Sequence, residues 1–351
     1  MKILLVYEPS FSDFENPFVP TLKSAMEYAG ADVDWGLSLF WESEEKYDYI
    51  FFQWPEAIVN FRKVREEDVL CVSARLNEWI ARGAKVAYTR HNVRPHTQSS
   101  SASLGLYRLV ENSADIIFHM GEYSRVQMLE AHIAEKAKHC VVPHHIPESI
   151  SRDVDKLDAR SRLGIDAAAK VILCFGAFRT DDERHMVLDA YKALDIKEKV
   201  LLAPSFYTAP VFRRNPFGLA RNLIKRIPFV FSGFAKTKPR VPNKDLPLYF
   251  SASDAVLIQR QEILNSGNLP MAYYFGRPVV GPAVGNVGEI LKQTGNFRFD
   301  PKCMNSVVSA LSSALSSNVV RVGESNRKYA ELNWSSADVG AAIIKVFVEN
   351  Q

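Results

Sequence analysis

Short apolar runs and amphipathic stretches alternate along most of the chain. A run of about four to eight apolar residues is typical of a strand buried on both faces, and apolar residues at helical spacing indicate an amphipathic helix. In the first part of the chain, strands are expected at 1–7, 31–35, 47–54, 84–88, 114–118 and 140–143, and helices at 19–30, 67–82, 104–112 and 124–138. Strands that alternate with helices predict a doubly wound α/β domain.

A second series of the same kind follows a charged stretch without a long apolar run. Strands are expected at 170–175, 200–202, 229–231, 255–258 and 278–280, and helical stretches at 269–275, from 285 to 289, at 306–316 and at 337–348. A chain of 351 residues suits two domains. The predicted organisation is a first Rossmann-like domain over 1–147, a linker over 148–169, a second Rossmann-like domain over 170–332, and a C-terminal helix within 333–351.

The stretch from 251 to 291 carries the clearest functional pattern. Its first strand is followed by the polar turn Asn265-Ser266-Gly267-Asn268 and then by a helix whose Pro270 suits the first turn. Backbone N–H groups of a glycine-containing turn, together with the positive end of a helix dipole, favour an anion. The turn therefore predicts a diphosphate site.

The series SASDAVL … SGN … MAYYFGRPVVGP … GNVGEI resembles the C-terminal domain of GT-B-fold, nucleotide-sugar-dependent glycosyltransferases, near the retaining family-4 type. The resemblance implies two Rossmann-like doubly wound domains that face a central cleft, with a final helix that crosses back to the first domain. It also implies a UDP- or GDP-linked sugar as donor substrate. The two glutamates of that family align here with Ile263 and Met271, and Glu262 lies next to Ile263.

Further donor residues follow from the same resemblance. Gly176 and Arg179 stand in a segment similar to the family's F-G-x-I-R-x-x-K, whose lysine position is Asp182 here. A glycine at a strand end lets the backbone approach a ligand, and an arginine can bind phosphate oxygens, although an ordinary surface ion pair is the alternative. The predicted donor-binding residues are Gly176, Arg179, Asn265, Ser266, Gly267, Asn268 and Glu289.

The segment TRHNVRPH follows the strand expected at 84–88, at the edge of the sheet where ligands bind in such domains. Similar HN-x-x-PH segments occur at this place in related glycosyltransferases. We therefore expect Asn92, Arg94 and His96 on the acceptor side. His91 and Glu262 are the candidate catalytic residues. Hydrogen-bonded structural histidines are the alternative for this segment.

Composition narrows the functional classes. The net charge of +3 does not favour a nucleic-acid partner. The four cysteines show no CxxC spacing, and Asp32-Val33-Asp34 is better explained by alternation along a half-buried strand than as a metal–diphosphate motif. No apolar run approaches the roughly 20 residues of a membrane span. We expect a cytoplasmic protein that uses neither a metal nor another cofactor.

These observations favour a metal-independent glycosyltransferase of hexosyltransferase type. It would move a sugar from a nucleoside-diphosphate donor to a hydroxyl of a lipid-linked or polysaccharide intermediate. Two alternatives stay open. One is a GT-B-like binding or scaffold protein without catalysis, suggested by Met271 and Asp182, and the other is a nucleotide-sugar epimerase.

The segment 206–240 departs from the pattern, because it holds eight Lys or Arg residues among apolar ones and no acidic residue. One interpretation is a surface helix packed on its own domain with a solvated basic face. The other is contact with an anionic membrane surface, which would place the protein at the inner face of the membrane.

Vesicle binding separates these two interpretations. If the segment meets a membrane, replacing Arg213, Arg214, Lys225 and Arg226 by Gln should weaken binding to phosphatidylglycerol vesicles by several kcal/mol at low salt, because each cation contributes about 1 kcal/mol. Co-sedimentation at two salt concentrations measures the effect, which salt should screen. Wild-type protein that stays in the supernatant at low salt would rule out the membrane interpretation.

Overall fold

The computed structural model describes residues 1–10, 12, 14, 16–95, 100–206, 241–316 and 319–350. The chain divides into two compact units, of which the first comprises Met1–Pro147 with Asn333–Gln351 and the second comprises Glu148–Leu332. Each unit contains one parallel sheet flanked by helices, so the predicted α/β class is confirmed. Among the described residues, no helix is both long and apolar enough to cross a membrane.

The first unit is built on a six-stranded parallel sheet in the order β2-β1-β3-β4-β5-β6. Its strands are β1 (Lys2–Val6), β2 (Asp32–Trp35), β3 (Tyr49–Phe52), β4 (Lys85–Thr89), β5 (Ile116–His119) and β6 (Lys138–Val141). The strand order reverses at β1, which lies between β2 and β3. Chain segments that leave β1 and β3 therefore turn to opposite faces of the sheet, and such a switch point is where ligands bind in doubly wound folds.

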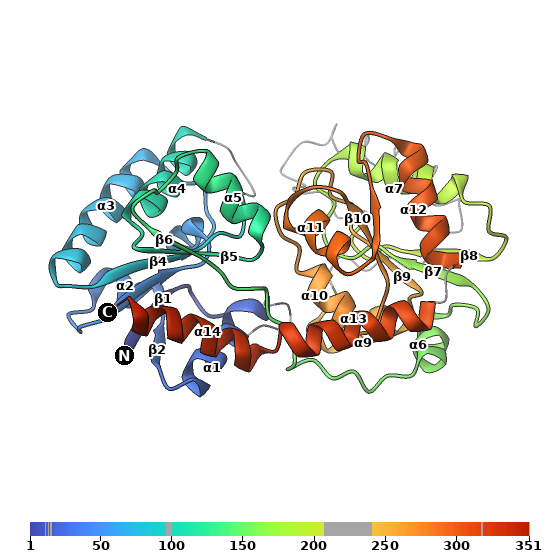
Figure 1. Cartoon of the computed structure of the whole chain (residues 1–351), viewed down its shortest axis with the longest axis horizontal. Helices are drawn as coiled ribbons and strands as arrows, with labels where there is room; N and C mark the ends of the chain where they lie inside the picture. The colour runs from blue at the N-terminus through green and yellow to red at the C-terminus, as the bar shows by residue number, and fades with distance from the viewer. Residues whose placement is uncertain are drawn as a thin grey trace, which may run out of the picture. The chain divides into compact units, whose positions relative to one another are not determined.

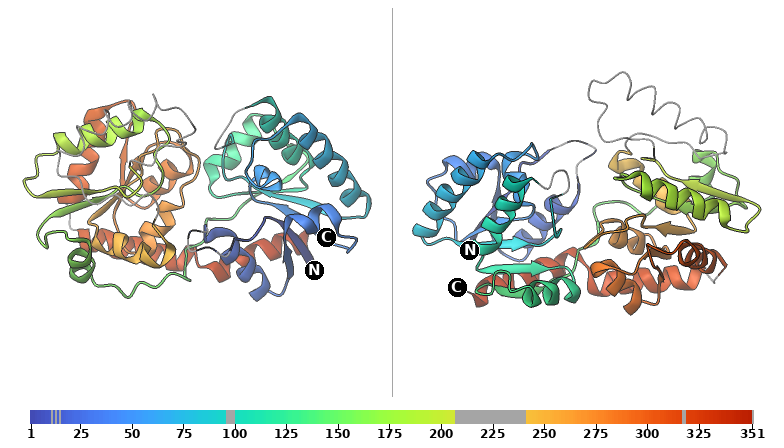
Figure 2. Two further views of the ribbon diagram at one scale, coloured as in Figure 1. Left: turned by 180° about the vertical axis from the view of Figure 1, so that it is seen from behind. Right: turned by 90° about the horizontal axis from the view of Figure 1, so that it is seen from above.

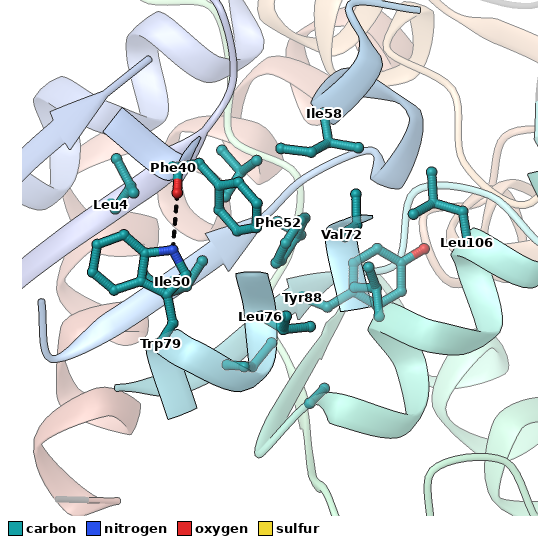
Figure 3. Packing of buried hydrophobic residues seen from close by; sticks show 14 of the residues in the cluster. Leu4, Phe40, Ile50, Phe52, Ile58, Val72, Leu76, Trp79, Tyr88 and Leu106 are labelled. Atoms are coloured by element: carbon teal, nitrogen blue, oxygen red, sulfur yellow. Dashed lines mark hydrogen bonds between the residues drawn. The ribbon is translucent and has the colours of Figure 1, made fainter. Parts of the chain in front are cut away.

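Side chains alternate between the two faces of this sheet. Ile3, Leu5 and Phe51 pack on one face against α1 (Phe18–Tyr28) and α14 (Ser336–Glu349), which run side by side in Figures 1 and 2. The opposite face packs against α3 (Glu66–Ala81) and α4 (Ser101–Ser113). In that core the Trp79 indole N–H donates to the Phe40 carbonyl at 3.0 Å (Figure 3). The remaining helices are α2 (Leu37–Glu42), the 3₁₀ helix η1 (Pro55–Val59) and α5 (Glu122–Glu130).

The helix expected at 124–138 is shorter than predicted. It ends at Glu130, because the backbone then enters the left-handed region at His132 (φ 54°) and Ala134 (φ 53°). Asp34 of the DxD sequence lies on the edge strand β2, where it accepts a hydrogen bond from the Tyr47 hydroxyl at 2.9 Å.

The second unit is built on a five-stranded parallel sheet in the order β11-β10-β9-β7-β8. Its strands are β7 (Lys170–Leu173), β8 (Lys199–Leu202), β9 (Ala255–Leu257), β10 (Val279–Pro282) and β11 (Phe297–Phe299). Its helices are α6 (Lys156–Leu163), α7 (Asp181–Ala193), η2 (Asn243–Asp245), α9 (Leu246–Ala252), α10 (Asn268–Tyr274), α11 (Gly285–Gln293), α12 (Met304–Ser316) and α13 (Val319–Asn333). The sequence did not predict β11 or α13. The strand expected at 229–231 and the basic segment over 207–240 lie outside the described residues.

Asp254, which is 5% exposed, joins three elements of the second unit. One of its oxygens pairs with Lys156 at 2.5 Å, and the other accepts from Arg160 at 2.8 Å and from the Val171 backbone N–H at 2.7 Å. Burial acts to raise the pKa of Asp254, but these hydrogen bonds and the two positive charges outweigh it and lower the pKa. Asp254 therefore stays ionised and fastens α6 to the start of β7.

The contact between α1 and α14 has no room for a side chain at Gly340. A Cβ atom there would lie 2.4 Å from the Ala25 carbonyl oxygen and 2.8 Å from the Ala25 Cβ. The two helix backbones approach closely at this point, which lets Val339, Ile343 and Phe347 reach the sheet.

Gly340→Ala should lower the free energy of unfolding by about 1–3 kcal/mol, because the helices must separate to admit the methyl group. The matched control is Gly105→Ala in α4, where the nearest atoms lie 4.0 Å from the new Cβ. That change should leave stability unchanged or raise it by up to about 1 kcal/mol through helix propensity. Urea unfolding of both variants measures the difference, and equal stability of the two would contradict the close approach.

Candidate functional site

The strand order of the second sheet reverses at β7, which lies between β8 and β9. The loops that follow β7 and β9, residues 174–180 and 258–267, therefore border the switch point of this unit. Two side chains join them: Gln259 Nε2 donates to the Ala177 carbonyl at 3.2 Å, and Arg260 Nη2 donates to the same oxygen at 2.6 Å. The predicted donor-binding residues are distributed mainly over these two loops and the helices that follow them.

Gly176 and Asn268, which are far apart in the sequence, lie against each other. Gly176 has φ of +90°, a value that favours glycine, and a Cβ atom there would lie 3.4 Å from Asn268 Nδ2. The Asn268 amide in turn donates to the Phe175 carbonyl at 2.7 Å. The bare backbone at Gly176 and the amide of Asn268 thus form one wall of the switch point.

An ion pair between Arg260 and Glu183, which the sequence did not predict, joins the loop after β9 to the start of α7 next to Gly176. Arg260 Nη1 lies 2.8 Å and 2.7 Å from the two carboxylate oxygens of Glu183, whose residue is only 5% exposed. The same carboxylate accepts the Arg179 backbone N–H at 2.7 Å. Thr180 and Glu183 have the spacing of a capping box, but the carboxylate reaches Arg179 rather than Thr180, and only the Thr180 hydroxyl caps α7.

Arg179 contributes a second guanidinium to this region. The residue is exposed overall, but partial loss of solvation and then the positive charge of Arg260 lower the pKa of its guanidinium, while Glu183 acts in the opposite direction. Two guanidinium groups therefore share the field of one carboxylate. These guanidinium groups can bind an anion beside Gly176, in a region that also holds the carboxylates of Asp181 and Asp182.

The turn from Asn265 to Asn268 differs from the expectation in one respect. Asn268 N–H donates to Ser266 Oγ at 3.3 Å, and Leu269 N–H donates to the Ser266 carbonyl at 3.1 Å, so the N–H groups that open α10 are already used within the turn. Gly267 is exposed at the N-cap of this seven-residue helix. Attraction of an anion depends more on the arginines than on the helix dipole.

The opposite end of the same loop is fixed to α11. Gly285 has φ of +62°, and a Cβ atom there would lie 2.2 Å from the Ile263 carbonyl oxygen. Asn265 Oδ1 accepts from Asn286 Nδ2 at 2.7 Å, and Asn286 N–H donates to the Leu264 carbonyl at 2.9 Å. Asn265 thus holds the loop in place.

The remaining positions that the sequence analysis considered are Glu262, Met271 and Glu289. Glu262 is exposed, and Met271, at the family's second glutamate position, is 9% exposed within α10. Glu289 is half-buried near Tyr329, and after burial its negative charge is the second cause that raises the pKa of that tyrosine.

The predicted acceptor residues lie in the first unit, after β4. His91 is 6% exposed and stacks on Trp54 with ring centroids 4.1 Å apart, while its Nε2 lies 3.0 Å from Gln53 Oε1. Asn92 is half-buried, Arg94 is exposed, and His96 lies outside the described residues. Gln53 and the neighbouring Glu56, which sequence reasoning missed, follow β3 and border the switch point of this sheet.

Other histidines of the first unit have structural environments. Burial, followed by the positive charge of His139, lowers the pKa of His119 to about 3, and its Nδ1 lies 2.8 Å from Ser124 Oγ. Burial also lowers the pKa of His144 to about 3. His145 Nε2 donates to the Phe18 carbonyl at 3.0 Å. Among the described residues, no three His, Cys, Asp or Glu side chains are grouped so that they could hold a metal ion.

Comparison with solved structures decides the fold. The chain is similar to sucrose-phosphate synthase from Thermosynechococcus elongatus, with a TM-score of 0.73 and 14% identity over 99% of this chain and 98% of that one. It is also similar to the HepE protein of Anabaena in complex with UDP-glucose, with a TM-score of 0.71 and 13% identity over 99% and 100% of the two chains. The chain has the GT-B fold.

A third GT-B-fold neighbour is the catalytic domain of starch synthase IV from Arabidopsis thaliana bound to ADP and acarbose, with a TM-score of 0.67 and 11% identity over 99% of both chains. At these identities the likeness establishes the fold and no activity. No protein-family model matches the chain, and no curated protein matches it.

The Glu183–Arg260 pair should stabilise the second unit of this GT-B fold. Glu183→Gln removes the bidentate partner of a guanidinium whose side chain is 12% exposed, so we expect a loss of about 3 kcal/mol in unfolding free energy. The double variant Glu183→Gln/Arg260→Met should recover part of that loss, because it leaves no buried charge unpaired.

Asp158→Asn provides the control, because its pair with Arg162 joins two side chains more than half exposed and should change stability by under about 1 kcal/mol. Denaturant unfolding measures the wild type, these three variants and the single variant Arg260→Met, which completes the double-mutant cycle. Additive effects of the two substitutions at Glu183 and Arg260 would show that the pair makes no coupled contribution.

Proposed function

We propose that the protein is a glycosyltransferase that uses a nucleoside-diphosphate sugar, with the diphosphate bound at the switch point of the second unit. The observation that carries this proposal is the convergence of Gly176, Asn268, Arg179 and Arg260 on the loops after β7 and β9. Backbone without a side chain, an amide and two guanidinium groups are all able to bind a diphosphate. The structural neighbours in complex with UDP-glucose or bound to ADP support the same class of donor.

Charge neutralisation is the chemical contribution of this site. In glycosyl transfer the departing nucleoside diphosphate gains negative charge as the sugar–phosphate bond breaks. Arg179 is positioned to stabilise that charge, since Glu183 and Arg260 fix the loop that carries it. A guanidinium with a preset geometry can do this without a metal ion.

We assign the acceptor hydroxyl to the first unit, where His91 is the candidate for contact with the reacting groups. Glu262 is the weaker candidate because its side chain is exposed. We further propose that the enzyme transfers a hexosyl group and that the acceptor is a lipid-linked or polysaccharide intermediate. The enzyme would be cytoplasmic and would associate peripherally with the membrane through 206–240.

Nucleotide-sugar binding without turnover is the competing function. It is favoured by Met271, a buried thioether at a position where the resembling family has a glutamate. A thioether cannot accept the strong hydrogen bonds that a carboxylate accepts from ribose hydroxyls.

Arg179→Gln should lower the affinity for UDP, GDP or ADP, whichever the wild-type protein binds, by about ten-fold or more, because a charge-assisted hydrogen bond to phosphate is lost. Arg162→Gln, at an arginine 55% exposed on α6, should bind the nucleotide as the wild type does. Titration calorimetry measures both variants. Equal affinity of Arg179→Gln and wild type would place the diphosphate elsewhere.

Turnover separates the enzyme from the binding protein. Hydrolysis of a panel of nucleotide sugars should release nucleoside diphosphate slowly, and excess EDTA should leave the rate unchanged. Binding without any hydrolysis or transfer would favour the competing function. Loss of activity on chelation that manganese restores would show that the donor site needs a metal.

A further inference from the structure

Four polar side chains at the carboxyl ends of β3 and β4 are buried with atoms that have no hydrogen-bond partner in the described structure. These atoms are Gln53 Nε2, both carboxylate oxygens of Glu56, and the hydroxyls of Tyr88 and Tyr107. The four residues are between 0% and 4% exposed. They come from three elements, η1 with the residues before it, β4 and α4, and η1 packs against α4. Figure 3 shows the Tyr88 hydroxyl pointing toward α4 beside Leu106.

The pKa directions place these groups close together. Burial, then Tyr88 and then Glu56 raise the pKa of Tyr107. Burial also raises the pKa of Tyr88, and the charges of Glu111 and Glu56 add to that effect. Glu56 and Asn92 also act on the pKa of Tyr107 as hydrogen-bonding neighbours, in opposite directions, so Tyr88, Tyr107 and Glu56 share one polar region.

A second buried glutamate in the same unit has its pKa affected by nearby positive charges. Glu111, 8% exposed, faces Arg90, whose positive charge opposes the rise that burial causes in the pKa of Glu111. Arg90 Nη1 in turn donates to the Ser124 carbonyl at 3.0 Å. Glu56 is buried more deeply, and neither of its oxygens is bonded.

Unbonded buried polar atoms lower the stability of a fold, and a carboxylate lowers it most. Such groups are retained where a ligand completes their hydrogen bonds, which is why they concentrate at binding sites. The position agrees with this, since Gln53 and Glu56 follow β3 at the switch point of the first sheet. Between them Trp54, which is half-buried, stacks on His91.

The chemistry of the four groups selects the ligand. Glu56 would repel a phosphate or carboxylate, so an anion does not fit. An ammonium group would satisfy Glu56 but would accept nothing from the Gln53 amide or the tyrosine hydroxyls. A hydroxyl both donates and accepts, so neighbouring hydroxyls of one ligand can satisfy the carboxylate, the amide and the phenols together.

We propose that Gln53, Glu56, Tyr88 and Tyr107 form a subsite that binds the hydroxyl groups of a sugar, with Glu56 as the residue that selects a neutral polyhydroxyl ligand. This inference rests on the proposed function, because the sugar is then the acceptor on which the first unit acts.

The first test uses stability, which requires no knowledge of the ligand. Glu56→Gln removes an unpaired buried charge while keeping the shape of the side chain, so its Tm should equal or exceed that of the wild type. Glu111→Gln removes the counter-charge of buried Arg90, so its Tm should fall by several degrees. A fall for Glu56→Gln as large as that for Glu111→Gln would show that Glu56 is a structural carboxylate and would overturn the proposal.

The second test uses sugar binding. Saturation-transfer NMR with a mixture of D-glucose, D-galactose, D-mannose and N-acetyl-D-glucosamine at millimolar concentration should show at least one bound sugar on the wild-type protein. Glu56→Gln and Tyr107→Phe should weaken that binding about ten-fold or more. An unchanged signal in both variants would contradict the subsite, as would the absence of any bound sugar on wild type.

Nucleotide binding keeps this inference separate from the proposed function. UDP, GDP and ADP titrated into Glu56→Gln should bind as they do to wild type, because the donor site is assigned to the second unit. A protein that binds nucleotide but no sugar would refute the subsite alone. A protein that binds sugar but no nucleotide would refute the proposed donor site and leave the subsite standing.

Discussion

The geometry of the second unit's switch point depends on the ion pair between Glu183 and Arg260. Glu183 lies in the first turn of α7 and Arg260 follows β9, so the pair joins the two loops that border the site. The same two side chains also bind main-chain groups, at Arg179 N–H and the Ala177 carbonyl. Separation of the loops would leave several buried polar groups unpaired at once, which makes this part of the site rigid. The main chain at Arg179, at the base of its exposed side chain, is thereby anchored.

Most strands could be predicted because parallel strands buried on both faces are nearly continuous apolar runs. β11 and α13, two of the elements that were missed, lack such a signal. β11 is Phe-Arg-Phe over Phe297–Phe299, a three-residue edge strand with its central arginine exposed. α13 contains Gly323, which weakens a helix prediction, yet a Cβ atom there would lie 2.1 Å from the Gly276 carbonyl oxygen. Glycine is required at this position by a tertiary contact, which no local sequence pattern reveals.

Some residues of the candidate site could likewise be predicted from the sequence, and others could not. Gly176, Arg179 and the turn at Asn265–Asn268 could be found because glycine and polar residues at the carboxyl end of an apolar run indicate a ligand-binding loop. Arg260 also lies just after an apolar run, so its position indicated a ligand-binding loop. Its partner Glu183 could not be recognised, because a glutamate in the first turn of a helix resembles an ordinary capping residue. Ser266 was expected to leave N–H groups free and instead bonds two of them, a local competition that residue type alone does not resolve. Glu56 looks unremarkable in sequence, because only the folded structure shows that its carboxylate is buried and unbonded.

The place of α14 has a consequence for how the protein is made. Val339, Ile343 and Phe347 complete one face of the first sheet, and the Tyr49 hydroxyl donates to the Phe347 carbonyl at 2.9 Å. The first unit therefore combines segments that are synthesised before and after the second unit. Until α14 has been synthesised, the apolar face formed by Ile3, Leu5 and Phe51 has only α1 to cover it. The second unit is fully synthesised before α14 is made. During synthesis the first unit therefore begins first, but the second unit can complete its core first.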